Sequence, residues 1–186
     1  MEKGLRTFVA IEFKPEAKLL SCWNEIVRQT KMDSIKWVND KTLHLTLHFL
    51  GNTPISLVEK IKSDLHASVE GFGSFSCSLK SLGYFGNPIP KVVWVGIDKS
   101  EKIVELQKKV EQAVNNNGFE SDIRGFNPHI TLGRVKFMNS VQPFRELIEK
   151  YNGEPFQENT VDKLIFYRSD LKPTGPIYTP IDVIKL

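Results

Sequence analysis

The chain carries one short pattern twice, as His44-Leu45-Thr46-Leu47 and as His129-Ile130-Thr131-Leu132. Polar and apolar side chains alternate in both copies, which is typical of a β-strand with one buried face. Residues two apart point to the same side of a strand, so His44 and Thr46 share one face and Leu45 the other. Each copy therefore presents one imidazole and one hydroxyl from a strand.

The rest of the chain repeats in the same order. Aligning the strand-like segments 7–12 and 93–98 through Phe8 and Trp94 gives an offset of 86 (94 minus 8), against 85 (129 minus 44) for the motif histidines. The sequence therefore predicts one bilobal domain over residues 1–186, built by duplication. Its pseudo-repeats cover about residues 6–85 and 91–170, with a C-terminal strand at 177–185.

Helical spacing and end signals predict four helices between the strands. These helices cover about residues 15–29, 53–69, 100–117 and 139–148. Further strands are expected at 75–84 and 160–167, and the turn-rich stretch 85–90 is the predicted seam between the repeats.

The expected fold class is α+β, with two antiparallel sheets flanked by helices and a central cleft. A parallel α/β sheet is the rival arrangement. It is ranked lower because residues 75–79 alternate between apolar and polar, which suits an antiparallel sheet with one covered face.

Composition is that of a globular domain, with 40% hydrophobic and 25% charged residues. No apolar run approaches the ~20 residues that cross a bilayer, and the first residues lack a secretory pattern. The two cysteines, Cys22 and Cys77, have no ligand or redox spacing, so we expect reduced thiols in a cytoplasmic protein. A net charge of +3 permits a phosphate-bearing substrate without predicting one.

Two opposed imidazoles suit the opening of a cyclic phosphodiester. One group must take a proton from the attacking water and another must protonate the leaving oxygen, on opposite sides of the phosphorus. Histidine has an ordinary pKa of about 6.5, so one neutral and one protonated copy coexist near neutral pH. Thr46 and Thr131 add hydroxyls that donate hydrogen bonds to phosphate oxygens. The residues alone leave open which of His44 and His129 is the acid.

Arg134 follows the second motif histidine by five residues and would supply a cation to the same phosphate. Strict alternation puts this position on the opposite face. Arg134 therefore serves only if the strand ends or bulges near Gly133, or if its side chain wraps round; the alternative is a surface arginine. The corresponding residue in the first repeat is Phe49, which alternation turns toward the core. The same alternation puts His48 on the histidine face, where we expect a solvated side chain.

Metal binding is the competing use of two histidines. Catalytic zinc sites take about three protein ligands, commonly His with Asp, Glu or Cys. Neither motif has a carboxylate or thiol at ligand spacing. We therefore expect no metal and no other cofactor.

The longer segments His44–Gly51 and Asn127–Arg134 resemble the paired signatures of the 2H phosphoesterase superfamily. Within it, the chain resembles the RNA 2′,3′-cyclic phosphodiesterases, also described as 2′-5′ RNA ligases. Segments 6–11, 90–96 and 171–178 resemble the family's first strand, mid-chain strand and C-terminal turn, so the likeness covers nearly the whole length. One His-x-Thr is a weak signal, but two at matching places in a duplicated chain are specific.

The resemblance implies hydrolysis of a terminal 2′,3′-cyclic phosphate to a 2′-phosphomonoester without metal. It implies His44 as the proton donor and His129 as the proton acceptor. It also implies phosphate contacts from Thr46, Thr131 and Arg134. Ligation to a 2′-5′ bond is the reverse of this chemistry, with an RNA hydroxyl in place of water.

The expected partners are RNAs with 2′,3′-cyclic phosphate ends, such as tRNA fragments, or small nucleotides, bound by a monomer without membrane contact. Two other functions stay open: an RNA-end binding module with little turnover, and a cyclic phosphodiesterase on small nucleotides. Of the aromatic residues that could stack a base, Tyr84 and Phe85 at the seam are the better candidates, and Trp94 is expected in the core. The other aromatic candidates are Trp37 and Phe13.

Overall fold

The computed structural model describes residues 4–98, 101–121, 125–173 and 175–186. All four predicted helices are present, with ends within about two residues of those expected. In chain order the elements are β1 (Gly4–Glu12), α1 (Ala17–Gln29), β2 (Ser34–Trp37), the 3₁₀ turn η1 (Asp40–Thr42), β3 (His44–Pro54), α2 (Ile55–Val69), β4 (Phe75–Phe85), β5 (Val92–Ile97), α3 (Glu101–Asn115), β6 (His129–Phe137), α4 (Val141–Glu149), β7 (Pro155–Val161), β8 (Lys163–Lys172) and β9 (Gly175–Lys185).

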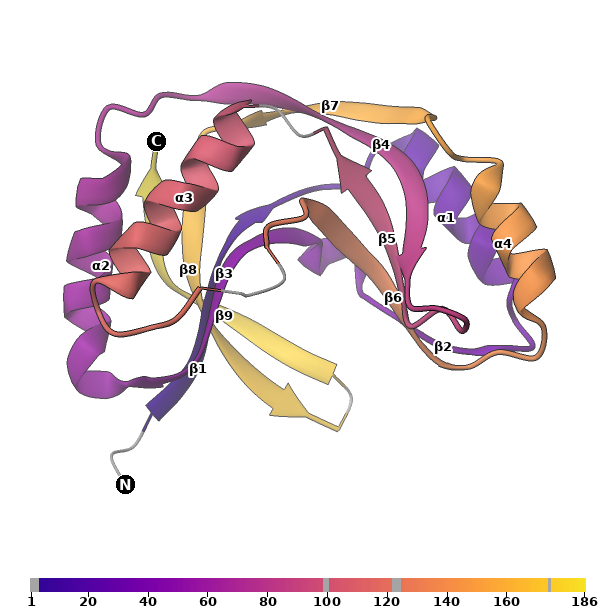
Figure 1. The fold of residues 1–186 in the computed structure, drawn as a ribbon, viewed down its shortest axis with the longest axis horizontal. Helices are drawn as coiled ribbons and strands as arrows, with labels where there is room; N and C mark the ends of the chain where they lie inside the picture. The colour runs from indigo at the N-terminus through magenta and orange to yellow at the C-terminus, as the bar shows by residue number, and fades with distance from the viewer. Residues whose placement is uncertain (1–3, 99–100, 122–124, 174) are drawn as a thin grey trace.

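The described strands form an antiparallel sheet in the order β7-β4-β5-β6-β3-β1-β8-β9, with β2 paired to β6. This confirms the α+β class. The expected two sheets are instead two halves of one sheet, joined where β3 meets β6. That joint holds a single residue pair, Leu45 with Ile130. Figure 1 shows the two halves on either side of the joint, each with its own pair of helices.

Strands from the two predicted repeats are exchanged between the halves of the sheet. β4, from the first repeat, pairs with β5 and β7, whereas β8 and β9, from the second, extend the sheet beyond β1. The turn-rich stretch 85–90 is a turn, but it closes the β4–β5 hairpin within one half and is no seam between lobes. The strand predicted at 160–167 is two strands, β7 and β8, which break at Asp162. Spacing along the chain does not say which strands pair, so this arrangement could not be predicted from the sequence.

The helices cover the sheet at two places. α2 and α3 pack on each other and on β3, while α1 and α4 contact β7 and β4 (Figure 1). α3 illustrates why the helices pack on the sheet: its apolar side chains recur every three or four residues, so they form one face, and they are fully buried. These side chains are Ile103, Leu106, Val110 and Val114. The main core therefore lies between the helices and the sheet.

A second, smaller apolar cluster is separate from that core. It consists of Phe8 and Ala10 of β1 with Ile165 and Tyr167 of β8. The residues between them on β1, such as Val9, belong to the main core. Because neighbours on a strand point to opposite faces, the small cluster lies on the face of the sheet that the helices leave open.

Two further sequence expectations can be compared with the structure, and one strand was not expected. Cys22 and Cys77 are free thiols on α1 and β4, as expected. Among the described residues, no helix has both the length and the apolar character to cross a membrane. The short strand β2, which pairs with β6 from Ser34 to Trp37, was not predicted, because four residues carry too little periodicity.

Candidate active site

The two motif strands meet at the joint between the halves of the sheet. Leu45 and Ile130, the residues that pair there, are 1% and 0% exposed and belong to the main core. Their neighbours in each strand point the other way. Both His-x-Thr pairs therefore lie next to each other on the open face of the sheet.

A β-bulge in β6 brings Arg134 to the same face. Opposite β5, Thr131 pairs with Trp94 and Arg134 with Val92, so three steps along β6 match two along β5. The extra residue, at 132–133, reverses the alternation of side chains. Because Trp94 and Val92 share a face of β5, Thr131 and Arg134 share the adjoining face of β6. A bulge near Gly133 was one of the conditions under which the sequence allows Arg134 to reach the phosphate, and β6 has this bulge.

β3 has a bulge at the matching place, which overturns two expectations. Leu47 is the extra residue opposite β1, between Thr46 and His48. Beyond it the alternation is reversed, so His48 turns inward and is 6% exposed, which makes the prediction of a solvated histidine wrong. Phe49, predicted in the core, is 49% exposed on the site face. The guanidinium of Arg6 lies over it, with Cζ 4.5 Å from the ring centroid.

Both motif histidines are held by the same kind of hydrogen bond. His44 Nδ1 donates to the carbonyl oxygen of Thr42 at 2.9 Å, and His129 Nδ1 donates to that of Asn127 at 2.7 Å. A carbonyl oxygen only accepts, so each Nδ1 carries a hydrogen. The other ring nitrogen, Nε2, then accepts a proton when the ring is neutral and donates one when it is charged. Each imidazole thus has the tautomer and orientation of a proton-transfer group.

The surroundings of the two imidazoles favour their neutral forms. Burial lowers the pKa of both His44 and His129, against the effect of the carbonyl hydrogen bonds, which raise the pKa. The positive charge of Arg134 lowers both pKa values further, and His129 adds a repulsion that lowers the pKa of His44. One guanidinium therefore acts on both rings.

Aromatic side chains border each histidine. The ring centroid of His44 lies 5.1 Å from that of Phe8 and 5.2 Å from that of Tyr178. The ring of His129 meets Phe85 edge-on, at 4.8 Å between centroids. These apolar neighbours explain why burial is the largest influence on both pKa values.

Of the aromatic residues singled out in the sequence, two lie at the site. Phe85 contacts the second motif histidine, and the ring centroid of Trp94 lies 5.3 Å from that of Phe85. Trp94 is half-buried on the site face, so the expectation that it lies in the core is wrong. Tyr84 packs on α4, Trp37 packs on α1 and Phe13 is buried. These three do not face the motif histidines.

Sequence reasoning missed the aromatic group beside His44. Phe8 stacks on Tyr167 at 5.1 Å and meets Tyr178 edge-on at 5.0 Å between centroids. A pocket of about 230 Å³ opens here, lined by Glu12 and His44 as well as by the two tyrosines. The aromatic residues and His44 come from β1, β3, β8 and β9, which no local pattern connects. The available signal was that both tyrosines stand in strand-like sequence near the C-terminus.

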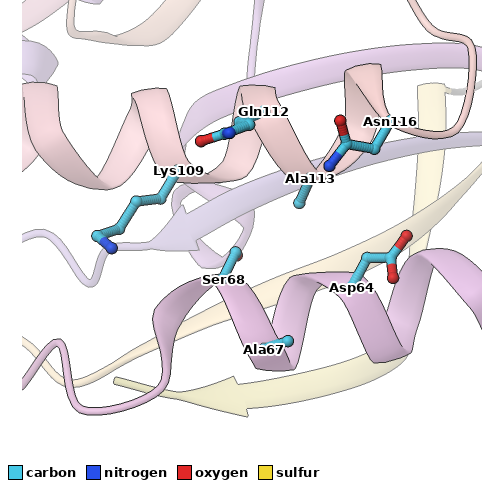
Figure 2. Close-up of a pocket in the computed structure, with 7 residues that line it drawn as sticks. All are labelled: Asp64, Ala67, Ser68, Lys109, Gln112, Ala113 and Asn116. Atoms are coloured by element: carbon cyan, nitrogen blue, oxygen red, sulfur yellow. The ribbon is translucent and has the colours of Figure 1, made fainter.

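A larger pocket, of about 370 Å³, lies between α2 and α3 and contains none of the candidate residues (Figure 2). It opens among helix residues such as Asp64 and Lys109, on the side of the sheet away from the motifs. Within the described ranges, no group of three or more His, Cys, Asp or Glu side chains is placed to hold a metal ion. The candidate chemistry therefore gathers at the joint of the sheet.

Comparison with known proteins agrees with this fold and site. Residues 20–173 match the 2′-5′ RNA ligase superfamily. Proteins named RNA 2′,3′-cyclic phosphodiesterase from Thermotoga maritima and Methanocaldococcus jannaschii are 35% and 34% identical, covering 94% and 95% of this chain and 91% and 98% of their own. The crystal structure of a Thermus thermophilus protein, TT0787, superposes with a TM-score of 0.81 at 26% identity, over 98% of each chain.

The fold and the paired motif strands define a 2H phosphoesterase, which confirms the resemblance found in the sequence. The chain belongs to the 2′-5′ RNA ligase superfamily.

Proposed function

We propose that this protein hydrolyses 2′,3′-cyclic phosphate ends of RNA to 2′-phosphomonoesters, with His44 and His129 as acid and base and without a metal ion. The observation that carries the proposal is the matched pair of imidazoles, each bonded through Nδ1 to a main-chain carbonyl on one face of the sheet. Relatives at about a third identity bear the name of this activity.

In the proposed reaction, His129 Nε2 takes a proton from water as the water oxygen forms a bond to phosphorus. The bond from phosphorus to the ribose 3′ oxygen breaks, and His44 Nε2 gives its proton to that oxygen. The ring opens to a 2′-phosphate, and the two histidines end with exchanged protonation. Proton exchange with solvent then restores the starting state. With an RNA 5′ hydroxyl in place of water, the same steps form a 2′-5′ bond: the 5′ oxygen bonds to phosphorus as the bond to the 3′ oxygen breaks.

The phosphate is held by the remaining residues of the open face. The hydroxyls of Thr46 and Thr131 donate hydrogen bonds to its non-bridging oxygens, and Arg134 offsets their negative charge. Arg134 also acts on both histidines, so its position beside the two rings fits a phosphate held between them. All of these groups come from one chain, and we expect the protein to act as a monomer in the cytoplasm.

The decisive experiment incubates the protein with an oligonucleotide ending in a 2′,3′-cyclic phosphate in the presence of EDTA. We expect conversion to a product that carries a 2′-phosphate and no 3′-phosphate, as ³¹P NMR distinguishes. Absence of product at every pH would contradict the proposal and favour a binding module. A product with a 3′-phosphate would contradict the assignment of the leaving oxygen.

The pH dependence tests the two-histidine mechanism. Activity rises with pH as the base becomes neutral and falls with pH as the acid loses its proton, so kcat/KM should be bell-shaped. Because the pKa values of both histidines are lowered, we expect the maximum below the ordinary value of about 6.5. A flat profile across this range would contradict acid–base catalysis by the pair.

A further inference from the structure

Three cationic side chains lie on the open face of the sheet, on both sides of the joint between β3 and β6. Lys36 of β2 pairs directly with Arg134 of β6, and both residues are exposed. Arg6 is exposed on β1, where it lies over Phe49. Phe49 occupies the position in β3 that Arg134 occupies in β6, so Arg6 fills the corresponding place in the first half of the sheet.

These cations lie around the aromatic group of the site. Burial raises the pKa of Tyr178, and the nearby positive charges of Arg134 and Arg6 oppose this rise. The ring of Tyr178 in turn contacts His44 and Phe8. On the other side, Lys36 Nζ lies beside Gly175 at the turn of the β8–β9 hairpin. The cations therefore continue from the candidate phosphate site to this hairpin, which projects from the sheet (Figure 1).

None of the three cations has an anionic partner among the described residues. In the part of the chain that the structure describes, exposed cations such as Lys80 form ion pairs, but Arg6, Lys36 and Arg134 form none and make no hydrogen bond through their side chains. A cyclic phosphodiester carries one negative charge, which one guanidinium offsets. Three unpaired cations on one face thus exceed what the reacting phosphate needs, which indicates further anionic groups on the ligand.

The charges around the site indicate where the rest of the ligand lies. Glu12 and Lys41 both line the pocket beside His44, so the acidic and basic charges there balance, and Glu12 lies six residues from Arg6 on β1, roughly 20 Å along a strand. A chain of phosphates is therefore not attracted to this pocket, whereas Arg6 and Lys36 attract it. The upstream phosphates should lie beside Arg6 and Lys36.

We propose that Arg6 and Lys36 bind the phosphodiester groups upstream of the cyclic end, so that the site selects an RNA strand over a mononucleotide. This inference rests on the proposed function and names its substrate class. Arg6 and Lys36 contribute to binding and take no part in proton transfer.

The test compares uridine 2′,3′-cyclic phosphate with a dinucleotide and a tetranucleotide that have the same cyclic end. For the wild type, we expect kcat/KM to increase with length. Arg6→Gln and Lys36→Ala should each lower kcat/KM on the oligonucleotides about fivefold, as for one exposed charge contact, and leave the mononucleotide unchanged. Arg6→Lys should restore part of the preference, because it keeps the charge. Lys109→Ala, in the groove between α2 and α3 (Figure 2), is the matched control and should change neither substrate.

Salt dependence separates a phosphate contact from a structural effect. Each lost contact should reduce the slope of log Kd against log salt concentration by about 0.7 for a single-stranded oligonucleotide. Kd is measured with oligonucleotides that already carry a terminal 2′-phosphate, so this readout does not depend on turnover. Failure to hydrolyse any substrate would contradict the proposed function and leave the binding test intact.

Two results would overturn the inference. One is a wild-type enzyme whose Kd and kcat/KM for the mononucleotide equal those for the tetranucleotide. The other is an equal loss on both substrates in Arg6→Gln and Lys36→Ala, which would place these cations on the reacting phosphate or in the fold.

Discussion

The two motif strands hold their histidines in the same way and differ in the charge beside them. Both β3 and β6 bulge just after the motif threonine, and both histidines donate from Nδ1 to a main-chain carbonyl. Five residues after the histidine, however, β6 has Arg134 where β3 has Phe49. In the proposed mechanism, the two proton transfers use equivalent positions in the two halves, whereas the reacting phosphate is offset by a single cation, Arg134.

The two bulges bring the fifth residue after each motif histidine to the open face of the sheet. A strand without a bulge would turn position five of each motif into the core. With the bulge, Arg134 and Phe49 both reach the open face. The first half then adds a cation from the neighbouring strand, through Arg6.

Removing either histidine should have the largest effect. His44→Ala and His129→Ala should each lower kcat by about 10²- to 10⁴-fold, because each removes one proton transfer. The double variant should lose little more than the worse single variant, since the two act as a unit. The residual activity of His129→Ala should lack the acidic limb of the pH profile, and that of His44→Ala the alkaline limb. The opposite assignment of limbs would exchange the acid and the base.

Arg134→Ala tests the asymmetric half of the comparison. We expect kcat/KM to fall by about 10²- to 10³-fold, the loss typical of one donor to a developing negative charge. Because the charge of Arg134 lowers the pKa of both histidines, its removal should also shift both limbs of the pH profile to higher pH. Arg134→Lys should keep the pH profile and recover part of the rate. A surface role would leave both measurements unchanged.

The two threonines test whether the halves contribute equally to the phosphate. Thr46→Val and Thr131→Val keep the shape of the side chain and remove one hydroxyl. Each should lower kcat/KM about 10- to 100-fold, since a hydrogen bond to a charged group contributes about 1.5–3 kcal/mol. Equal losses would extend the symmetry from the histidines to the phosphate. A loss confined to Thr131→Val would move the anion site toward the Arg134 half.

The smallest expected effect comes from a substitution in the bulge of β6, and it concerns stability. Gly133→Ala would place a Cβ 2.7 Å from the ring of Trp37 and 3.0 Å from Ile35, so β2 must shift. We expect the free energy of unfolding to fall by about 1–3 kcal/mol, measured by urea denaturation. The corresponding position in β3 is His48, which packs inward and pairs with Val9 of β1. An unchanged stability would show that β2 does not restrain the bulge.

Much of the site could be predicted because its signals are local. The alternation in each motif placed His44 with Thr46, and His129 with Thr131, on one face, and the helices were found from their spacing. The errors within the motif strands fall where the alternation is reversed. Phe49 and His48 were assigned to the wrong faces because the extra residue in β3 is visible only against the register of β1.

The sequence by itself determined the four helices, the two motif strands with their paired histidines, and the family, because side-chain periodicity and a repeated motif are properties of neighbouring residues. Only the tertiary structure decided that the halves join through Leu45 and Ile130 and that Arg134 faces the histidines. It also decided that Arg6 and Lys36 border the same site. These facts depend on which strands pair and in which register, and no stretch of a single strand contains that information.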